Sequence, residues 1–293
     1  MAFTSTGFPA ELVKEVFTGA KGHSSIAKLA KQTPIAFSGT DIMTFNFDGE
    51  VNLVAEGAAK GSHTNGNEPI NIVPLKIEYG ARVSDEFIKC SEEKKLEYLR
   101  SFNEGFTKKV ARGLDIMVMH GINPKTGALA QSIGTNSFDT NDDVHSVTYD
   151  SAHPNDNFED AVEVIGDYDL NGIAMSKTMA KALSKYTENG VRQFPQLAWG
   201  ANPDEINGVP SDINTTVSKV NGEYAYAGDF QNAFKWGYAD KVTLEVIEYG
   251  DPDNTGSDLK GHNQVYLRTE AWIGWAILDG AAFARIEDTS SGS

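Results

Sequence analysis

The stretch VAEGAAK, residues 54–60, lies between two arms in which apolar and polar residues alternate. The first arm runs from Thr44 to Val54 and the second from Ile70 to Val83, with a tip rich in Gly, Asn and Ser at residues 61–67. This pattern predicts a long β-hairpin whose arms each reach ~40 Å at ~3.3 Å per residue. An isolated ribbon of that length is marginally stable in water, so it needs a surface on another subunit. The hairpin therefore favours assembly over catalysis.

The chain of 293 residues is acidic, with a formal net charge of -16 and a pI of about 4.7. Such a surface disfavours non-specific nucleic-acid binding, which needs a basic stripe. Cys90 is the single cysteine, which excludes an intrachain disulfide and a cysteine-based zinc site. No apolar run approaches a membrane span and no secretory signal is visible at the N-terminus, so we expect a soluble protein with no membrane partner.

The longest helical pattern runs from Ser84 to about His120, with Ser84-Asp85-Glu86 as its expected N-cap. An apolar stripe at spacings of three and four predicts its buried side: Leu96, Leu99, Phe102, Phe106, Val110, Leu114 and Met117. Gly105 and Gly113 each cost such a helix roughly 1 kcal/mol relative to Ala. The preferred interpretation is that the helix tolerates the two glycines or needs them for close packing. The alternative interpretation is that they are points at which the helix bends.

The remaining chain is predicted to form an N-terminal arm before the helix and an alternation of helices and strands after it. In the arm, Ser24-Ser25 is expected to cap a short helix. Lysine and arginine are absent between Lys125 and Lys177, and this shift in composition predicts a domain crossing near Pro154. The expected later elements are helices at 158–165 and 176–186 and strands at 172–175, 225–229, 241–249 and 264–278.

No pattern in the chain carries recognisable chemistry. Residues 251–256 (DPDNTG) resemble the start of a calcium loop, but the twelfth position is His262 instead of Glu, so a plain surface loop is preferred. The six histidines form no HExxH pair, and there is no GxSxG elbow or phosphate-binding glycine loop. We expect no catalytic residue, metal or cofactor, although an acidic soluble hydrolase stays open as an alternative of a different class.

Several ordered motifs resemble those of the tailed-bacteriophage major capsid proteins of the Hong Kong type (HK-97-type fold). The resemblance covers roughly residues 7–287 and includes the stretch 54–60, which matches the extended-loop signature V-A-E-G-A-x-K. Further matches are Gly208-Val209-Pro210, Gly228-Asp229-Phe230, and the run Asn263–Glu270 (NQVYLRTE), which is followed by Gly274–Leu278 (GWAIL).

The resemblance implies an α+β fold in four parts and a short tail. These are an N-arm (1–40), an extended loop (41–82), a peripheral domain with a long spine helix (83–154 and 251–286), and an axial domain (155–250), with the tail at 287–293. Many relatives carry a scaffolding segment before the arm, so we expect a separate scaffolding protein here.

The resemblance further implies a major capsid protein that assembles as pentamers and hexamers into an icosahedral shell around double-stranded DNA. Expected partners are other copies of the chain, a portal and decoration proteins, in a virion assembled in the host bacterial cytoplasm. Some relatives join a loop lysine to a neighbour's asparagine with help from a glutamate; Lys60, Asn263 and Glu270 have the right residue types, but ordinary surface contacts are preferred. An encapsulin-type nanocompartment that encloses cargo enzymes is the alternative. The candidate subunit-interface residues are Phe45, Phe47, Val54, Glu56, Lys60, His63 and Ile72.

Overall fold

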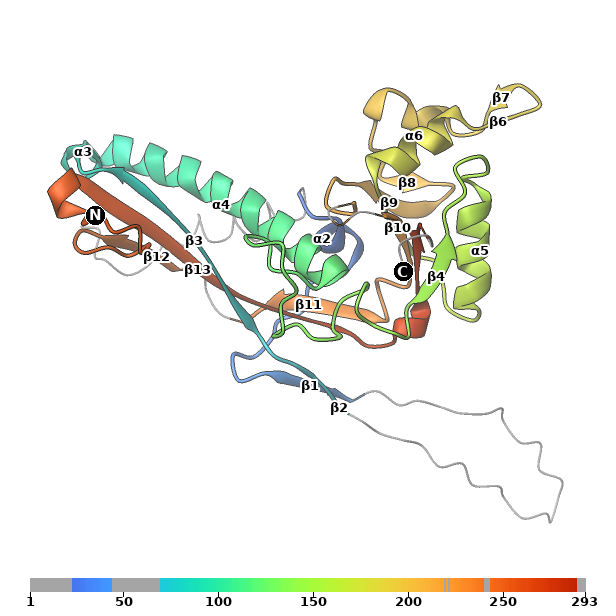
Figure 1. Ribbon diagram of the computed structural model, residues 1–293, viewed down its shortest axis with the longest axis horizontal. Helices are drawn as coiled ribbons and strands as arrows, with labels where there is room; N and C mark the ends of the chain where they lie inside the picture. Colours follow the sequence, from blue (N-terminus) through green and yellow to red (C-terminus); the bar gives the residue numbers. More distant parts are fainter. Residues whose placement is uncertain (1–22, 44–68, 219, 221, 240–242, 289–293) are drawn as a thin grey trace, which may run out of the picture.

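The computed structural model describes residues 23–43, 69–218, 220, 222–239 and 243–288. At one end of the molecule a long helix runs beside two long strands, and at the other a six-stranded sheet is covered by two helices (Figure 1). The mixed α+β class expected from the sequence is confirmed. Among the described residues, none of the helices combines the length and the apolar character needed to cross a bilayer.

The four-stranded sheet is organised around β13 (Gln264–Ile277). Strand β3 (Leu75–Ser84) pairs antiparallel with it, from Gln264 opposite Ser84 to Ile273 opposite Leu75. On the other edge β12 (Thr243–Ile247) and β11 (Phe234–Tyr238) pair with successive parts of β13. Alternate residues of β13 are buried from Val265 to Ile273, which is the period-2 pattern of a strand with one face on a core.

The predicted spine helix is present, but it begins later than expected. Ser84-Asp85 precedes only the short helix α3 (Glu86–Lys89), and α4 (Glu92–His120) starts after a break, with Ser91 as its N-cap. The predicted N-cap was therefore wrong for the long helix. Its 29 residues span ~44 Å at ~1.5 Å per residue. Most of the predicted stripe is buried, with Leu96 and Phe102 half-buried, and Gly121 ends the helix with φ +65°.

The six-stranded sheet has the order β4-β14-β10-β5-β9-β8. Its strands are β4 (His145–Thr148), β14 (Phe283–Glu287), β10 (Glu223–Gly228), β5 (Gly172–Met175), β9 (Val209–Ile213) and β8 (Glu205–Ile206). Adjacent residues face opposite sides: Tyr226 packs into the core shared with α4, whereas Ala225 and Ala227 pack beneath α5 (Asp156–Ile165) and α6 (Lys177–Lys185). This sheet therefore separates two hydrophobic cores.

Strand pairing crosses the domain limits expected from the sequence. Strands β11 and β12 fall within the expected axial range 155–250, yet they pair with β13 in the four-stranded sheet. Strands β4 and β14 fall within the expected peripheral ranges, yet they belong to the six-stranded sheet. Neither β4 nor β14 was expected from the sequence.

A short antiparallel ladder lies just before the predicted first arm, and the second arm differs from the prediction. Strand β1 (Thr40–Met43) pairs antiparallel with β2 (Pro69–Ile72), from Thr40 opposite Ile72 to Met43 opposite Pro69. The expected second arm is interrupted after Ile72, because β3 pairs with β13 instead of the first arm. Residues 44–68, including the stretch 54–60, lie outside the described residues.

The remaining elements are short. They are α2 (Ser25–Leu29), β6 (Thr187–Glu188), β7 (Val191–Arg192) and the 3-10 helices η1 (Pro195–Gly200), η2 (Lys260–His262) and η3 (Gly280–Ala282). The short helix predicted after Ser24 is confirmed as α2, with the Ser24 hydroxyl accepting from the Ala27 amide at 3.0 Å.

Candidate functional site

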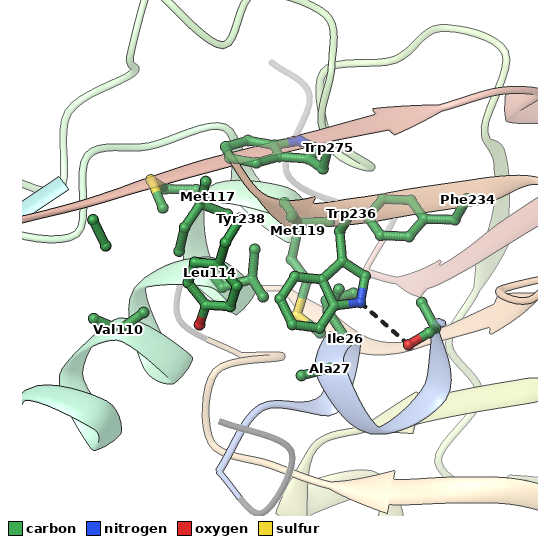
Figure 2. Close-up of a cluster of buried hydrophobic side chains, with 14 of the residues drawn as sticks. Ile26, Ala27, Val110, Leu114, Met117, Met119, Phe234, Trp236, Tyr238 and Trp275 are labelled. Atoms are coloured by element: carbon green, nitrogen blue, oxygen red, sulfur yellow. Dashed lines mark hydrogen bonds between the residues drawn. The ribbon is translucent and has the colours of Figure 1, made fainter. Parts of the chain in front are cut away.

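The described part of the N-terminal arm is docked onto its own subunit. Ile26 and Ala27 of α2 pack against Leu114 and Met119 of α4 and against Trp236 of β11 (Figure 2). The indole Nε1 of Trp236 donates to the Ala30 carbonyl at 3.2 Å. Beyond α2 the arm runs as an added strand, where the Thr33 amide donates to the Trp236 carbonyl at 2.8 Å. The arm therefore follows one fixed path from Ser24 to Ile35.

A buried carboxylate holds the start of this path. The Asp115 side chain is fully buried and accepts hydrogen bonds from the Ser24 hydroxyl at 2.5 Å and from the Ser25 and Ile26 amides at 3.0 and 3.1 Å. Asn214 and Thr216 donate to it from the other side, at 3.1 and 2.8 Å. Burial raises the pKa of Asp115 to about 6, although these hydrogen bonds act in the opposite direction. Asp115 thus ties the arm to α4 and to the loop after β9.

A second buried polar cluster lies at the end of α4. His120 is 2% exposed, and its Nδ1 lies 2.7 Å from an Asp139 carboxylate oxygen while its Nε2 lies 2.8 Å from the Thr216 carbonyl. Because both partners are acceptors, both ring nitrogens must donate, which makes His120 an imidazolium. Burial lowers the pKa of His120, but the hydrogen bond and the charge of Asp139 outweigh it, so the pKa is raised overall. Tyr226 completes the cluster by donating to Asp139 at 2.6 Å.

The histidine of this cluster is not arranged to catalyse a reaction or to bind a metal. His120, Asp139 and Glu223 have side-chain atoms within 4.8 Å of one another, a separation that suits a metal ion. However, both nitrogens of His120 are already used as donors, so no lone pair is offered to a metal. Tyr226 is as inaccessible as His120. The cluster acts as a structural junction, and sequence reasoning missed it because its members come from separate elements.

The acidic loop that resembles a calcium site binds an arginine of the same chain. Arg82 on β3 donates to Asp253 through Nε at 2.9 Å and through its Nη2 at 2.5 Å, and also to Asp251 at 2.7 Å. Its hydrogen bond and charge lower the pKa of Asp253 to about 2. The preference for a plain surface loop is supported, because the carboxylates that would hold calcium hold a guanidinium.

Of the candidate interface residues, only Ile72 lies within the described residues. It is 2% exposed and packs with Ile35 and Ala276 in its own subunit, so its side chain is not available to a neighbour. Outside the described residues lie Phe45, Phe47, Val54, Glu56, Lys60 and His63.

The candidate bend points lie within the continuous helix α4. A Cβ added at Gly105 would meet nothing within 4 Å, and one at Gly113 would meet only Pro124 Cγ, at 3.7 Å. Close packing therefore does not require either glycine. Whether the helix bends there during assembly stays a prediction.

The candidate cross-link residues occupy different parts of the four-stranded sheet. Asn263 is exposed just before β13, with φ +52°, whereas Glu270 lies within β13 and pairs with Lys76 at 2.7 Å. The two positions are ~20 Å apart along an extended strand. One subunit therefore cannot bring both to the same lysine, and the cross-link stays a prediction.

Comparison with known proteins agrees with this architecture. The sequence model of the phage capsid family matches residues 6–288. A solved structure from Mycobacterium phage Ogopogo is similar with 28% identity and a TM-score of 0.75, covering 91% of this chain and 92% of that one. One from Gordonia phage Cozz has 24% identity and a TM-score of 0.73, covering 92% and 87%. A capsid chain of an empty GTA particle has 16% identity and a TM-score of 0.64, covering 92% and 90%. A search of curated proteins found no match.

Proposed function

The chain belongs to the phage capsid family, and from this premise we propose that it is the subunit of pentamers and hexamers that close into an icosahedral shell around double-stranded DNA. That it is a major capsid protein of the HK-97-type fold, forming the shell of a virion, follows from the family match and the phage capsid structures that it resembles. The observation that carries the finer proposal is the family match over residues 6–288.

The arrangement of the subunit supports a role performed through interfaces. The paired strands β1 and β2 leave the body of the subunit at the base of the predicted extended loop (Figure 1). Helix α4 lies along the four-stranded sheet as a brace (Figure 1). Many weak contacts between identical subunits add up when each subunit makes several.

Strand pairing supports a revised division of the subunit. We assign to the peripheral domain the four-stranded sheet and α4, including β11 and β12, and to the axial domain the six-stranded sheet with α5 and α6, including β4 and β14. This division follows the sheets instead of the continuous sequence ranges.

A deletion of residues 56–68, the predicted hairpin tip, tests the proposal. We expect a folded subunit that no longer forms stable closed shells, because the tip supplies contact area on a neighbour. Electron microscopy of the deletion variant beside the intact chain is the measurement. Normal particles from the deletion variant would contradict the role given to the loop. Intact chain that stays monomeric would contradict the shell itself, and a monomer with turnover would support the hydrolase alternative.

The contents of the particle test the proposed partners. We propose packaged double-stranded DNA, a portal, a scaffolding protein and decoration proteins as partners, with assembly in the host cytoplasm. Nuclease-protected DNA inside virions is the expected result. Cargo enzymes in its place would favour the encapsulin-type alternative, which the phage capsid comparisons do not favour.

A further inference from the structure

The most exposed large side chain in the described residues is a tryptophan held in an unusual backbone conformation. Trp199 is 103% exposed and has φ +64°, in the left-handed region that residues other than Gly seldom adopt. Its neighbour Leu197 is buried, and η1 packs against α6, so the turn is anchored while the indole projects into solvent. Strained backbone of this kind persists only where the surrounding structure holds it, and it is concentrated at functional sites.

An apolar cavity lies on the same part of the molecule. It measures about 340 Å³ and lies between α5, α6 and the outer face of the six-stranded sheet. Its apolar lining includes Phe158, Val162, Leu170, Phe194, Ile206 and Val209. Pockets for small ligands range from about 300 to 1,000 Å³, so this one is at the small end of that range and has room for an indole.

The two helices beside the cavity carry opposite charge. The exposed acids of α5 are Asp156, Glu159, Asp160 and Glu163, and the helix has no basic residue. The exposed lysines of α6 are Lys177, Lys181 and Lys185, and this helix has no acidic residue. Within the described residues none of these lysines forms an ion pair. One subunit therefore offers two complementary surfaces that it does not join to each other.

We propose that neighbouring copies in a capsomer join these surfaces head to tail. Trp199 of one copy enters the cavity beside α5 of the next, and the α6 lysines of the first copy face the α5 acids of the second. A contact between two different patches of identical chains closes into a ring when the rotation between them allows it. A buried aromatic side chain surrounded by a charged rim is the usual anatomy of such a contact. This inference rests on the proposed function.

The occupant of the cavity is a second copy because both halves of the contact lie on this chain. A free small ligand would explain the cavity but neither the projecting indole nor the opposite charges of α5 and α6. Since η1 packs against α6, Trp199 and the lysine row belong to one unit. The cavity borders α5 through Phe158, Glu159 and Val162, and α6 through Leu183. In the proposed contact, a single approach of two copies engages both features.

The first test compares Trp199→Ala with Leu129→Ala in the full chain. Leu129 is also exposed, at 73%, but lies in the loop after α4, so it controls for loss of any surface apolar group. We expect Trp199→Ala to reduce assembled material at least tenfold in sedimentation, while the melting temperature of the free subunit stays unchanged. In the intact chain, tryptophan emission should shift to the blue on assembly, and Trp199→Phe should remove that shift.

The second test reverses the charges. Lys181→Glu and Asp160→Lys should each reduce assembly, and the double variant should recover most of it because the pair is restored with opposite sign. The inference would be overturned if Trp199→Ala formed shells at the same yield as the wild type and the Leu129→Ala control. That result would leave the proposed capsid function intact. The inference would also be overturned if each single charge variant assembled poorly and the double variant recovered no assembly. A wild-type chain that never assembles would contradict the proposed function itself.

Discussion

Replacing Gly237 with Ala should release the N-terminal arm from its own subunit. Gly237 lies in β11 where the arm crosses it, and a Cβ at this position would lie 1.7 Å from the Thr33 carbonyl oxygen and 2.9 Å from its carbon. Both are backbone atoms, so no rotamer change can relieve the clash. Either β11 or the arm must move.

The size of the effect follows from what the arm loses when it leaves. The Thr33 amide donates to Trp236 at 2.8 Å and the Ile35 amide to Tyr238 at 3.4 Å, each worth about 1 kcal/mol net. Ile35 is buried, and exposing it costs about 1.5–3 kcal/mol. Backbone entropy regained by the released segment offsets part of this. We therefore expect Gly237→Ala to lower the free energy of unfolding by about 2–4 kcal/mol.

The matched control is the same substitution at Gly105. That site has room for a methyl group and lies inside α4, so Gly105→Ala should raise the free energy of unfolding by about 1 kcal/mol. Denaturant unfolding of the free subunits measures both changes. Trypsin adds a local readout, because Lys31 lies in the released segment and should be cut faster in Gly237→Ala. An unchanged free energy of unfolding, together with unchanged cleavage at Lys31, would refute the reasoning.

Three further predictions concern the buried junction, the acidic loop and the spine helix. In the wild type, the free energy of unfolding should fall as pH rises from about 6.5 through the raised pKa of folded His120, because the stability from the imidazolium is present below the unfolded pKa and lost above the folded one. Denaturant unfolding of His120→Gln across pH 6 to 9 should show a smaller fall. An identical fall in the variant would exclude His120 as its source. Arg82→Lys removes the forked guanidinium donor, so the pKa of Asp253 should rise from about 2 toward its ordinary 3.8. Nuclear magnetic resonance titration measures this pKa, and an unchanged value would mean that Arg82 does not set it. In the wild type, the stability that depends on this shift is present above pH 3.8 and lost as pH falls through about 2. Gly113→Ala should trap an immature particle if α4 bends at that point, since the site has space for the methyl group; particles that mature normally in electron micrographs would count against a bend there.

Elements with a regular period were predictable from the sequence, and those defined by distant partners were not. Helix α6 begins after Ser176 as its pattern indicates, and most of the predicted stripe of α4 is buried. Strands β4 and β14 have four and five residues, too short for a period to show. Their place in the sheet depends on pairing with each other and with β10.

The same distinction holds for the polar sites. Arg82 alternates with apolar residues as any surface strand residue does, and its acceptors lie about 170 positions later in the chain. His120 is one of six scattered histidines, and nothing in its sequence context marks it as buried beside Asp139. Strand β2 falls in the predicted second arm because its alternation is local, whereas β1 precedes the predicted first arm. The change of partner after Ile72 was not predicted, since β13 is remote in sequence.

The charged groups at the end of α4 require an explanation other than stability. A buried ion pair is often no more stable than well-packed apolar side chains of the same size, because desolvation offsets the attraction. Asp115 and His120 nevertheless lie about 1.4 turns apart on α4, each fully or almost fully buried and each hydrogen-bonded to partners outside the helix. Apolar packing tolerates small rotations of a helix, whereas these hydrogen bonds hold only at one rotation and one axial position. Asp115 is hydrogen-bonded to the arm, and His120 is hydrogen-bonded to the loop after β9. Through Asp139, His120 is also linked to Tyr226 of β10. The junction thus fixes the angle between the spine helix and the six-stranded sheet, and a shell built from many copies of one subunit depends on that angle being the same in each.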